Sequence, residues 1–179
     1  MHPRLTEIMI FVEEKRRELL DSVEGVPREK LVRRPSPNAW SVAENIEHLR
    51  MVESGIAQII AKRVAQAREA GIGEEQATSS VMPSFARYGA TLDSSILKTP
   101  ERVEPKQNVD VVEALDGLIN SREALRSAVA AADGVPLAEI KHTHPVVGEL
   151  DLYQWLIFVG HHEARHHRQI ERTLKSISQ

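Results

Sequence analysis

The chain contains no cysteine. This absence excludes disulfide bonds, thiolate nucleophiles and cysteine-ligated metal sites, so a bound metal would have to be held by histidine or carboxylate side chains. Aromatic residues are scarce as well, at 4% of the chain. Leucine, alanine, glutamate and arginine are plentiful, and this composition favours helices over a sheet.

The sequence also lacks an excess of positive charge and long apolar runs. Its net charge of −3 provides no broad positive field that would attract nucleic acid or anionic lipid. Charged residues interrupt the apolar stretch near the amino terminus, unlike a secretory signal. No apolar run approaches the ~20 residues of a membrane-spanning helix. We therefore expect a cytoplasmic protein with no nucleic-acid or membrane partner.

The 179 residues fit a single domain, residues 1–179, that can bury a core of its own. Apolar residues recur at helical spacing in four segments, at about residues 4–22, 42–70, 109–132 and 151–176. Two of these begin with capping signals, Ser41 with Glu44 and Asp151 with Gln154. Residues 138–150 could hold a short extended piece.

The segment 71–108 is rich in glycine and proline and shows no strong period. A connection of this length in a compact domain is either functional or a crossover. It would allow the second and third helices to run parallel. The sequence thus predicts an all-α fold: a four-helix bundle with up-down-down-up order and a long crossover between helices 2 and 3.

The last predicted helix carries four histidines. At 100° per residue, His162 and His166 both lie within about 20° of the middle of the apolar stripe, whereas His161 and His167 lie on its flanks. Burying imidazole without a partner is costly. Two rings four residues apart offer two nitrogen ligands from one helical face to a divalent metal.

A cysteine-free site needs a third ligand. His48 is the first candidate, because it lies at the edge of the apolar face of the second helix. His144, beside Pro145 in the loop before the last helix, is the alternative. An isolated histidine at such an edge is more often a solvated or capping residue, so the argument depends on the pair in the last helix.

Glu163 completes the letters H-E-x-x-H, the signature of zinc proteases. The extended form of that signature requires glycine and histidine where the chain has Gln169 and Arg172. Glu163 also falls about 80° from the middle of the stripe. We therefore expect an exposed or rim carboxylate that pairs with His167 or Arg87. The sequence assigns no catalytic residue, and His144 and Glu163 are the candidates for such a role.

Several short motifs, taken in order, resemble the DinB/YfiT-like superfamily. The matching residues are Arg33-Arg34-Pro35, Trp40-Ser41, His48-Leu49, Val103-Glu104-Pro105, His144-Pro145 with Gly148, Trp155-Leu156, and His162, His166 and Gln169-Ile170. The resemblance implies an up-down-down-up bundle, often dimeric. It also implies a metal site formed by His48, His162 and His166, with zinc or nickel as the first candidates and iron or manganese as further ones.

Relatives in that superfamily include thiol-dependent transferases and hydrolase-like proteins. Our first hypothesis is therefore a metal-dependent enzyme, thiol S-transferase-like or hydrolase-like, whose substrate is a small molecule such as a low-molecular-weight thiol. The alternative is a non-catalytic metal- or ligand-binding bundle with a structural or stress-related role. Gln169, Asn45 and Glu44 are candidates to orient the ligand rings, since ligand imidazoles need partners for their second nitrogen.

Overall fold

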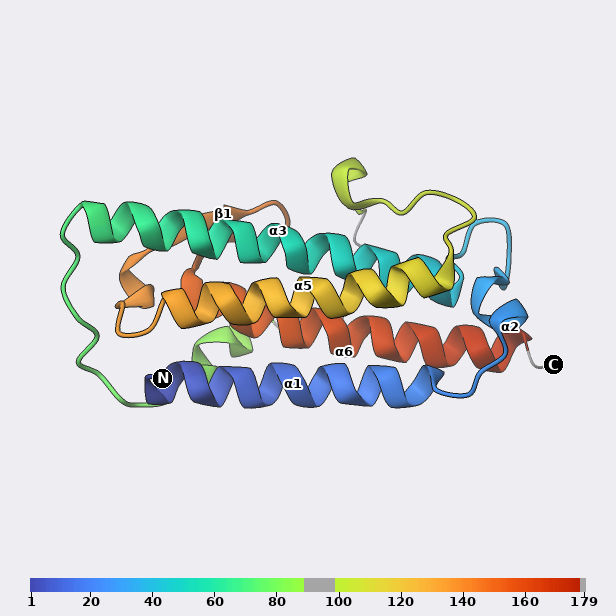
Figure 1. Ribbon diagram of the computed structural model, residues 1–179, viewed down its shortest axis with the longest axis horizontal. Coiled ribbons are helices and arrows are strands. Elements are labelled where there is room, and N and C mark those ends of the chain that lie inside the picture. The colour runs from blue at the N-terminus through green and yellow to red at the C-terminus, as the bar shows by residue number, and fades with distance from the viewer. Residues whose placement is uncertain (89–98, 178–179) are drawn as a thin grey trace.

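The computed structural model describes residues 1–88 and 99–177 (Figure 1). Within these ranges, five α-helices carry the labels of Figure 1: α1 (Pro3–Val23), α2 (Arg28–Val32), α3 (Val42–Glu69), α5 (Val111–Ala131) and α6 (Leu152–Ile177). The same described residues include three short 3-10 helices, η1 (Met82–Phe85), η2 (Glu101–Val103) and η3 (Leu137–Glu139). Two strands, β1 (Lys141–His144) and β2 (Gly148–Asp151), form an antiparallel hairpin.

The four long helices form a bundle. Helices α1 and α6 run in one direction and α3 and α5 in the other (Figure 1), which confirms the up-down-down-up order. The connection from α3 to α5 returns the chain along the length of the bundle, so α3 and α5 are parallel neighbours, as the long crossover predicted. Residues 89–98 of the predicted crossover segment 71–108 lie outside the described residues.

Both predicted capping boxes are present. The Ser41 hydroxyl accepts the Glu44 backbone N–H at 3.2 Å, and the Glu44 carboxylate accepts the Ser41 N–H at 2.8 Å. Asp151 and Gln154 exchange the same pair of bonds at 2.9 and 3.1 Å. Each box satisfies backbone donors that the first turn of a helix leaves unpaired. They fix where α3 and α6 begin, and hence the height of the histidines on each helix.

The predicted extended piece at 138–150 is the β1–β2 hairpin, in which His142 pairs with Leu150 and His144 with Gly148. In the first half of α5 the buried apolar positions are Val111 and Leu118, whereas the neighbouring Val112 and Ile119 are 52% and 60% exposed. No described helix is long and apolar enough to cross a membrane.

The core consists of two apolar clusters at opposite ends of the bundle. One joins the start of α1, the end of α3 and the start of α6, and the other joins the opposite ends of these helices. Between the clusters, each of the four long helices contributes one buried charged side chain. These residues, here called the ionic layer, are Arg16, Glu53, Arg122 and Glu163.

The ionic layer is a closed ring of ion pairs. Arg16 binds both Glu53, at 2.8 Å, and Glu163. Arg122 binds the same two carboxylates, at 2.7 and 2.8 Å. Two positive and two negative charges therefore balance in the interior, as burial of charge requires. Because each helix supplies one member, the ring also fixes the relative heights of all four helices.

Candidate metal centre

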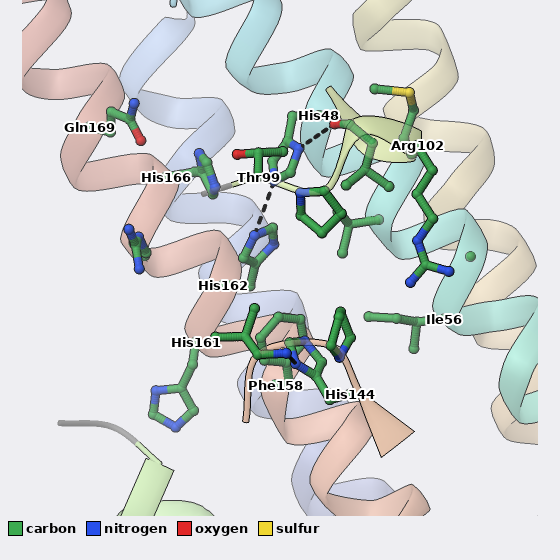
Figure 2. A pocket seen from close by; sticks show the side chains of 18 of the residues that line it. His48, Ile56, Thr99, Arg102, His144, Phe158, His161, His162, His166 and Gln169 are labelled. Atoms are coloured by element: carbon green, nitrogen blue, oxygen red, sulfur yellow. Dashed lines mark hydrogen bonds between the residues drawn. The ribbon is translucent and has the colours of Figure 1, made fainter. Parts of the chain in front are cut away.

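Three of the histidines singled out in the sequence come together across two helices. His48 lies on α3, and His162 and His166 lie one turn apart on α6 (Figure 2). One nitrogen from each ring lies within 4.8 Å of the other two. The His48 and His166 side chains are buried and His162 is partly buried. The helical spacing in α6 and the edge position in α3 thus produce the cluster.

In His48 and His166, hydrogen bonds determine which ring nitrogen faces the middle of the histidine cluster. The His48 Nδ1–H donates to the Val103 carbonyl at 2.7 Å, and the His166 Nδ1–H donates to Asn45 Oδ1 at 2.8 Å. With Nδ1 protonated in each neutral ring, the lone pair is on Nε2. His48 Nε2 lies 3.2 Å from His162 Nε2. Two nitrogens bound to one tetrahedral zinc ion would lie about 3.3 Å apart, from the usual Zn–N bond length.

Asn45 is itself held in place. Its side-chain NH₂ donates to the Ser41 carbonyl at 2.8 Å, so its Oδ1 must be the atom that faces His166. The Trp40 ring stacks on His166 with an interplanar angle of 15° and also contacts His48. The capping box that begins α3 therefore positions the groups that orient a ring on α6.

The surroundings keep the three imidazoles neutral. Burial lowers the pKa of His48, and it lowers the pKa values of His162 and His166 well below the ordinary value. The neighbouring histidines and Arg165 act in the same direction on the two rings of α6. Neutral imidazole is the form that binds a metal, so near neutral pH the cluster is ready to act as a ligand set.

The cluster lines a cavity of about 970 Å³. Helices α3 and α6 form its walls, and the crossover segment and the β1–β2 hairpin also contribute to it. Thr99 and Arg102 come from the crossover, and His144, Pro145 and Val146 from the hairpin. A metal ion on the histidines would face this cavity, which is large enough for a small organic molecule.

The three residues proposed from the sequence to orient the ligand rings lie in different places. Asn45 contacts a ring directly, as expected. Gln169 lines the cavity near His166 (Figure 2). Glu44 does not reach the rings, because its carboxylate binds the Ser41 N–H and the Arg34 guanidinium.

Comparison with known proteins identifies the family and supports the fold. The family model described as the DinB superfamily matches residues 12–170. The chain belongs to the DinB superfamily. The protein YuaE of Bacillus subtilis (strain 168) is 28% identical, over 94% of this chain and 98% of its own length. A crystal structure described as TT2238, a four-helix bundle protein, is 22% identical in sequence to this chain and superposes with a TM-score of 0.59. The match covers 94% of this chain and 98% of that one. This likeness supports the fold.

In this member of the DinB superfamily, the expectation for Glu163 is wrong. Glu163 is 1% exposed and binds Arg16 and Arg122, not His167 or Arg87. In a bundle α6 contacts neighbours over a wider arc than its apolar stripe, and the flank at Glu163 faces the interior. Burial raises the pKa of Glu163, while the two guanidinium groups act in the opposite direction. Glu163 does not line the large cavity, so it is not placed as a general base there.

Sequence reasoning missed the partners of Glu163, although a signal was present. Arg16 stands at the apolar position between Val12 and Leu19, and Arg122 precedes Leu125 in the stripe of α5. A charged residue at such a position points into the core. The Val103 carbonyl that orients His48 had no such signal, since any residue supplies a carbonyl.

His144, the alternative ligand, is not part of the three-histidine cluster. It lies at the hairpin end of the cavity, and its Nδ1 accepts the backbone N–H groups of Val146 and Val147 at 3.1 and 3.3 Å. Its ring contacts Trp155 and Phe158, with centroids 4.9 and 4.6 Å apart. Burial, with Arg102 nearby, lowers the pKa of His144 to about 4.

This lowered pKa predicts a share of the acid sensitivity of the fold. Between pH 6.5 and about 4, His144 is neutral in the folded chain and protonated in the unfolded one. The unfolded state then binds more protons, so the free energy of unfolding falls as the pH falls through this window. His144→Gln should reduce the slope of the free energy of unfolding against pH by up to the amount that corresponds to one bound proton. Urea unfolding of both metal-free proteins at several pH values measures it, and identical slopes would contradict the prediction.

Proposed function

We propose that this chain is a metal-dependent enzyme that acts on a small molecule. His48, His162 and His166 would hold the divalent metal ion. Zinc and nickel are the first candidates for this ion, and iron and manganese are the next. The observation that carries the proposal is the convergence of three neutral imidazoles at the wall of an open cavity. A structural metal site would be closed by a fourth protein ligand. Among the described residues, no carboxylate joins this cluster.

The ligand set and the family resemblance together support the proposed reaction classes. A divalent ion held by three histidines would supply Lewis-acid chemistry at a remaining coordination position, where a water or a thiol could be activated. We propose thiol S-transfer or hydrolysis because this chemistry serves both reactions and because the DinB/YfiT-like superfamily includes thiol-dependent transferases and hydrolase-like proteins. Since the chain has no cysteine, a thiol would have to enter as a substrate. The Val103 carbonyl and Asn45 hold the protons on Nδ1 of His48 and His166 and so keep both Nε2 atoms aimed at one point.

Asn45 offers a test of this orienting role. Replacing it with alanine removes the acceptor of the His166 Nδ1–H and leaves the ring free to rotate or change tautomer. Loss of such a partner typically weakens metal binding about 10–100-fold. We expect Asn45→Ala to lower zinc affinity by this factor in a competition titration with a chelating dye. Asn45→Asp, which keeps an acceptor, should retain most of the affinity. Equal affinity for wild type and Asn45→Ala would contradict the role.

Turnover decides between an enzyme and a binding protein. Protein purified without a polyhistidine tag would be loaded with zinc, nickel, iron or manganese. It would then be assayed for coupling of a low-molecular-weight thiol to a haloaromatic electrophile and for ester hydrolysis. We expect a metal-dependent rate that is absent in His166→Ala and retained in His167→Ala, a histidine change on the same helix outside the cavity. Full metal loading with no turnover in either assay would favour the non-catalytic alternative.

A further inference from the structure

Every charged side chain that lines the cavity, among the described residues, is basic. Among the described residues, no aspartate or glutamate lines it, although the chain has more acidic than basic residues, 26 against 23. The cationic residues that line it are Lys62, Arg102, Arg165, Arg168 and Arg172. Low-dielectric walls that carry charge of one sign attract the opposite charge. The lining therefore favours a ligand that is negatively charged.

Arg102 is joined through the backbone to the residue that orients His48. It stands on η2, directly before Val103, whose carbonyl orients His48. Arg102 and Lys62 both make no ion pair with any residue in the described part of the chain, and both are open to solvent. Figure 2 shows the Arg102 side chain along the α3 wall near Ile56, opposite the helix that carries His161 and His162. A ligand held by Arg102 would thus lie within the cavity that the histidines line.

His144 supplies a hydrogen-bond donor to the same region. Its Nδ1 accepts two backbone N–H groups, so Nδ1 carries no proton and the neutral ring must carry it on Nε2. The residue is 8% exposed and lines the cavity beside Phe158 (Figure 2). Its Nε2–H has no hydrogen-bond partner among the described residues, and packing against Trp155 and Phe158 holds the ring in place.

We propose that Arg102, Lys62 and the Nε2–H of His144 form a subsite for the carboxylate or phosphate group of a small organic anion. Val52, Ile56 and Phe158 would pack against the apolar part of that molecule. As a statement about the substrate, this inference rests on the proposed function. As a statement about binding, it requires only the residues of the cavity wall and no metal.

The probes are hexanoate, hexyl phosphate and the neutral hexanamide, each titrated into the metal-free and the zinc-loaded protein. Calorimetry gives affinity, and tryptophan fluorescence reports the site through Trp155, one of two tryptophans and in contact with His144. We expect saturable binding of at least one anion to both forms and about tenfold weaker binding of hexanamide, the usual effect of losing a charge-assisted hydrogen bond. The two anions distinguish a carboxylate from a phosphate preference.

Paired variants distinguish binding at the subsite from a general effect of the protein's net charge. Arg102→Gln should weaken anion binding about tenfold, whereas Arg17→Gln, which removes the same charge from an exposed position on α1 outside the cavity, should not change it. His144→Gln keeps an N–H donor near the place of Nε2, and His144→Asn keeps only the acceptor near Nδ1. Binding should survive the first change and weaken in the second.

Three results would overturn the inference: hexanamide binding as tightly as both anions, no saturable binding of any probe, or Arg102→Gln behaving like Arg17→Gln. Failure of the proposed function would give a different set of results. A chain that takes up no zinc, or shows no turnover, would still bind the anion with this pattern of variants if the subsite is correct.

Discussion

A variant carrying His162→Ala and His166→Ala is expected to lose its metal, from about one equivalent per chain to none detectable by elemental analysis. The reason is geometric: these two rings supply two of the three nitrogens that lie within 4.8 Å of one another. A single remaining imidazole, His48, cannot hold a divalent ion against water. The loss of affinity should exceed the roughly 10–100-fold expected when only a supporting hydrogen bond is removed.

Thermal unfolding gives a second readout of the same prediction. A ligand that binds only the folded state stabilises it, by about 2.7 kcal/mol when present at 100 times its dissociation constant. Added zinc should raise the melting temperature of the wild type and leave that of the double variant unchanged. His167→Ala is the matched control, because it removes a histidine of the same helix that lies outside the cluster. Metal retained at one equivalent in the double variant would place the site elsewhere.

Glu163→Gln is expected to destabilise the fold by about 3–5 kcal/mol, the usual cost of removing one partner from a buried ion pair. Glu163 is 1% exposed and is bound by Arg16 and Arg122. Without its charge, Glu53 alone remains in the ionic layer to balance two buried guanidinium groups. Urea unfolding followed by circular dichroism measures the change.

Glu123→Gln is the control for this experiment. The Glu123 side chain is 69% exposed and pairs with Arg126 on the same helix at 3.3 Å, so its loss should cost less than about 1 kcal/mol. The alternative role of Glu163, a general base within the H-E-x-x-H letters, predicts the opposite pattern. Near-normal stability of Glu163→Gln together with abolished turnover would support that role and contradict a structural one.

A double-mutant cycle would show whether the ionic layer acts as a unit. Arg16→Met and Glu163→Met each leave an unbalanced charge in the interior, whereas the double variant removes one charge of each sign. We expect the double variant to be more stable than the sum of the single effects predicts, by about 0.5–3 kcal/mol. Strict additivity would mean that the two residues do not share their stabilisation.

The sequence by itself determined the features that depend on neighbours along the chain. The four long helices are specified by apolar periodicity, and two of their starts by the capping boxes at Ser41 and Asp151. The pairing of His162 with His166 follows from helical spacing alone. The long connection between α3 and α5 was enough to indicate that these helices are parallel. In each case the physical cause acts within one helix or one connection.

Tertiary structure alone decided which distant groups meet. His48 joins the α6 pair because α3 and α6 pack with these residues at the same level, and no pattern within either helix encodes the offset between the two. The Val103 carbonyl, the balance of charge around Glu163 and the cationic lining of the cavity arise from packing between segments far apart in sequence. Helical spacing showed that Glu163 lies beside the apolar stripe; only the positions of Arg16 and Arg122 show that this flank is interior, because the energy of a buried charge depends on its partners.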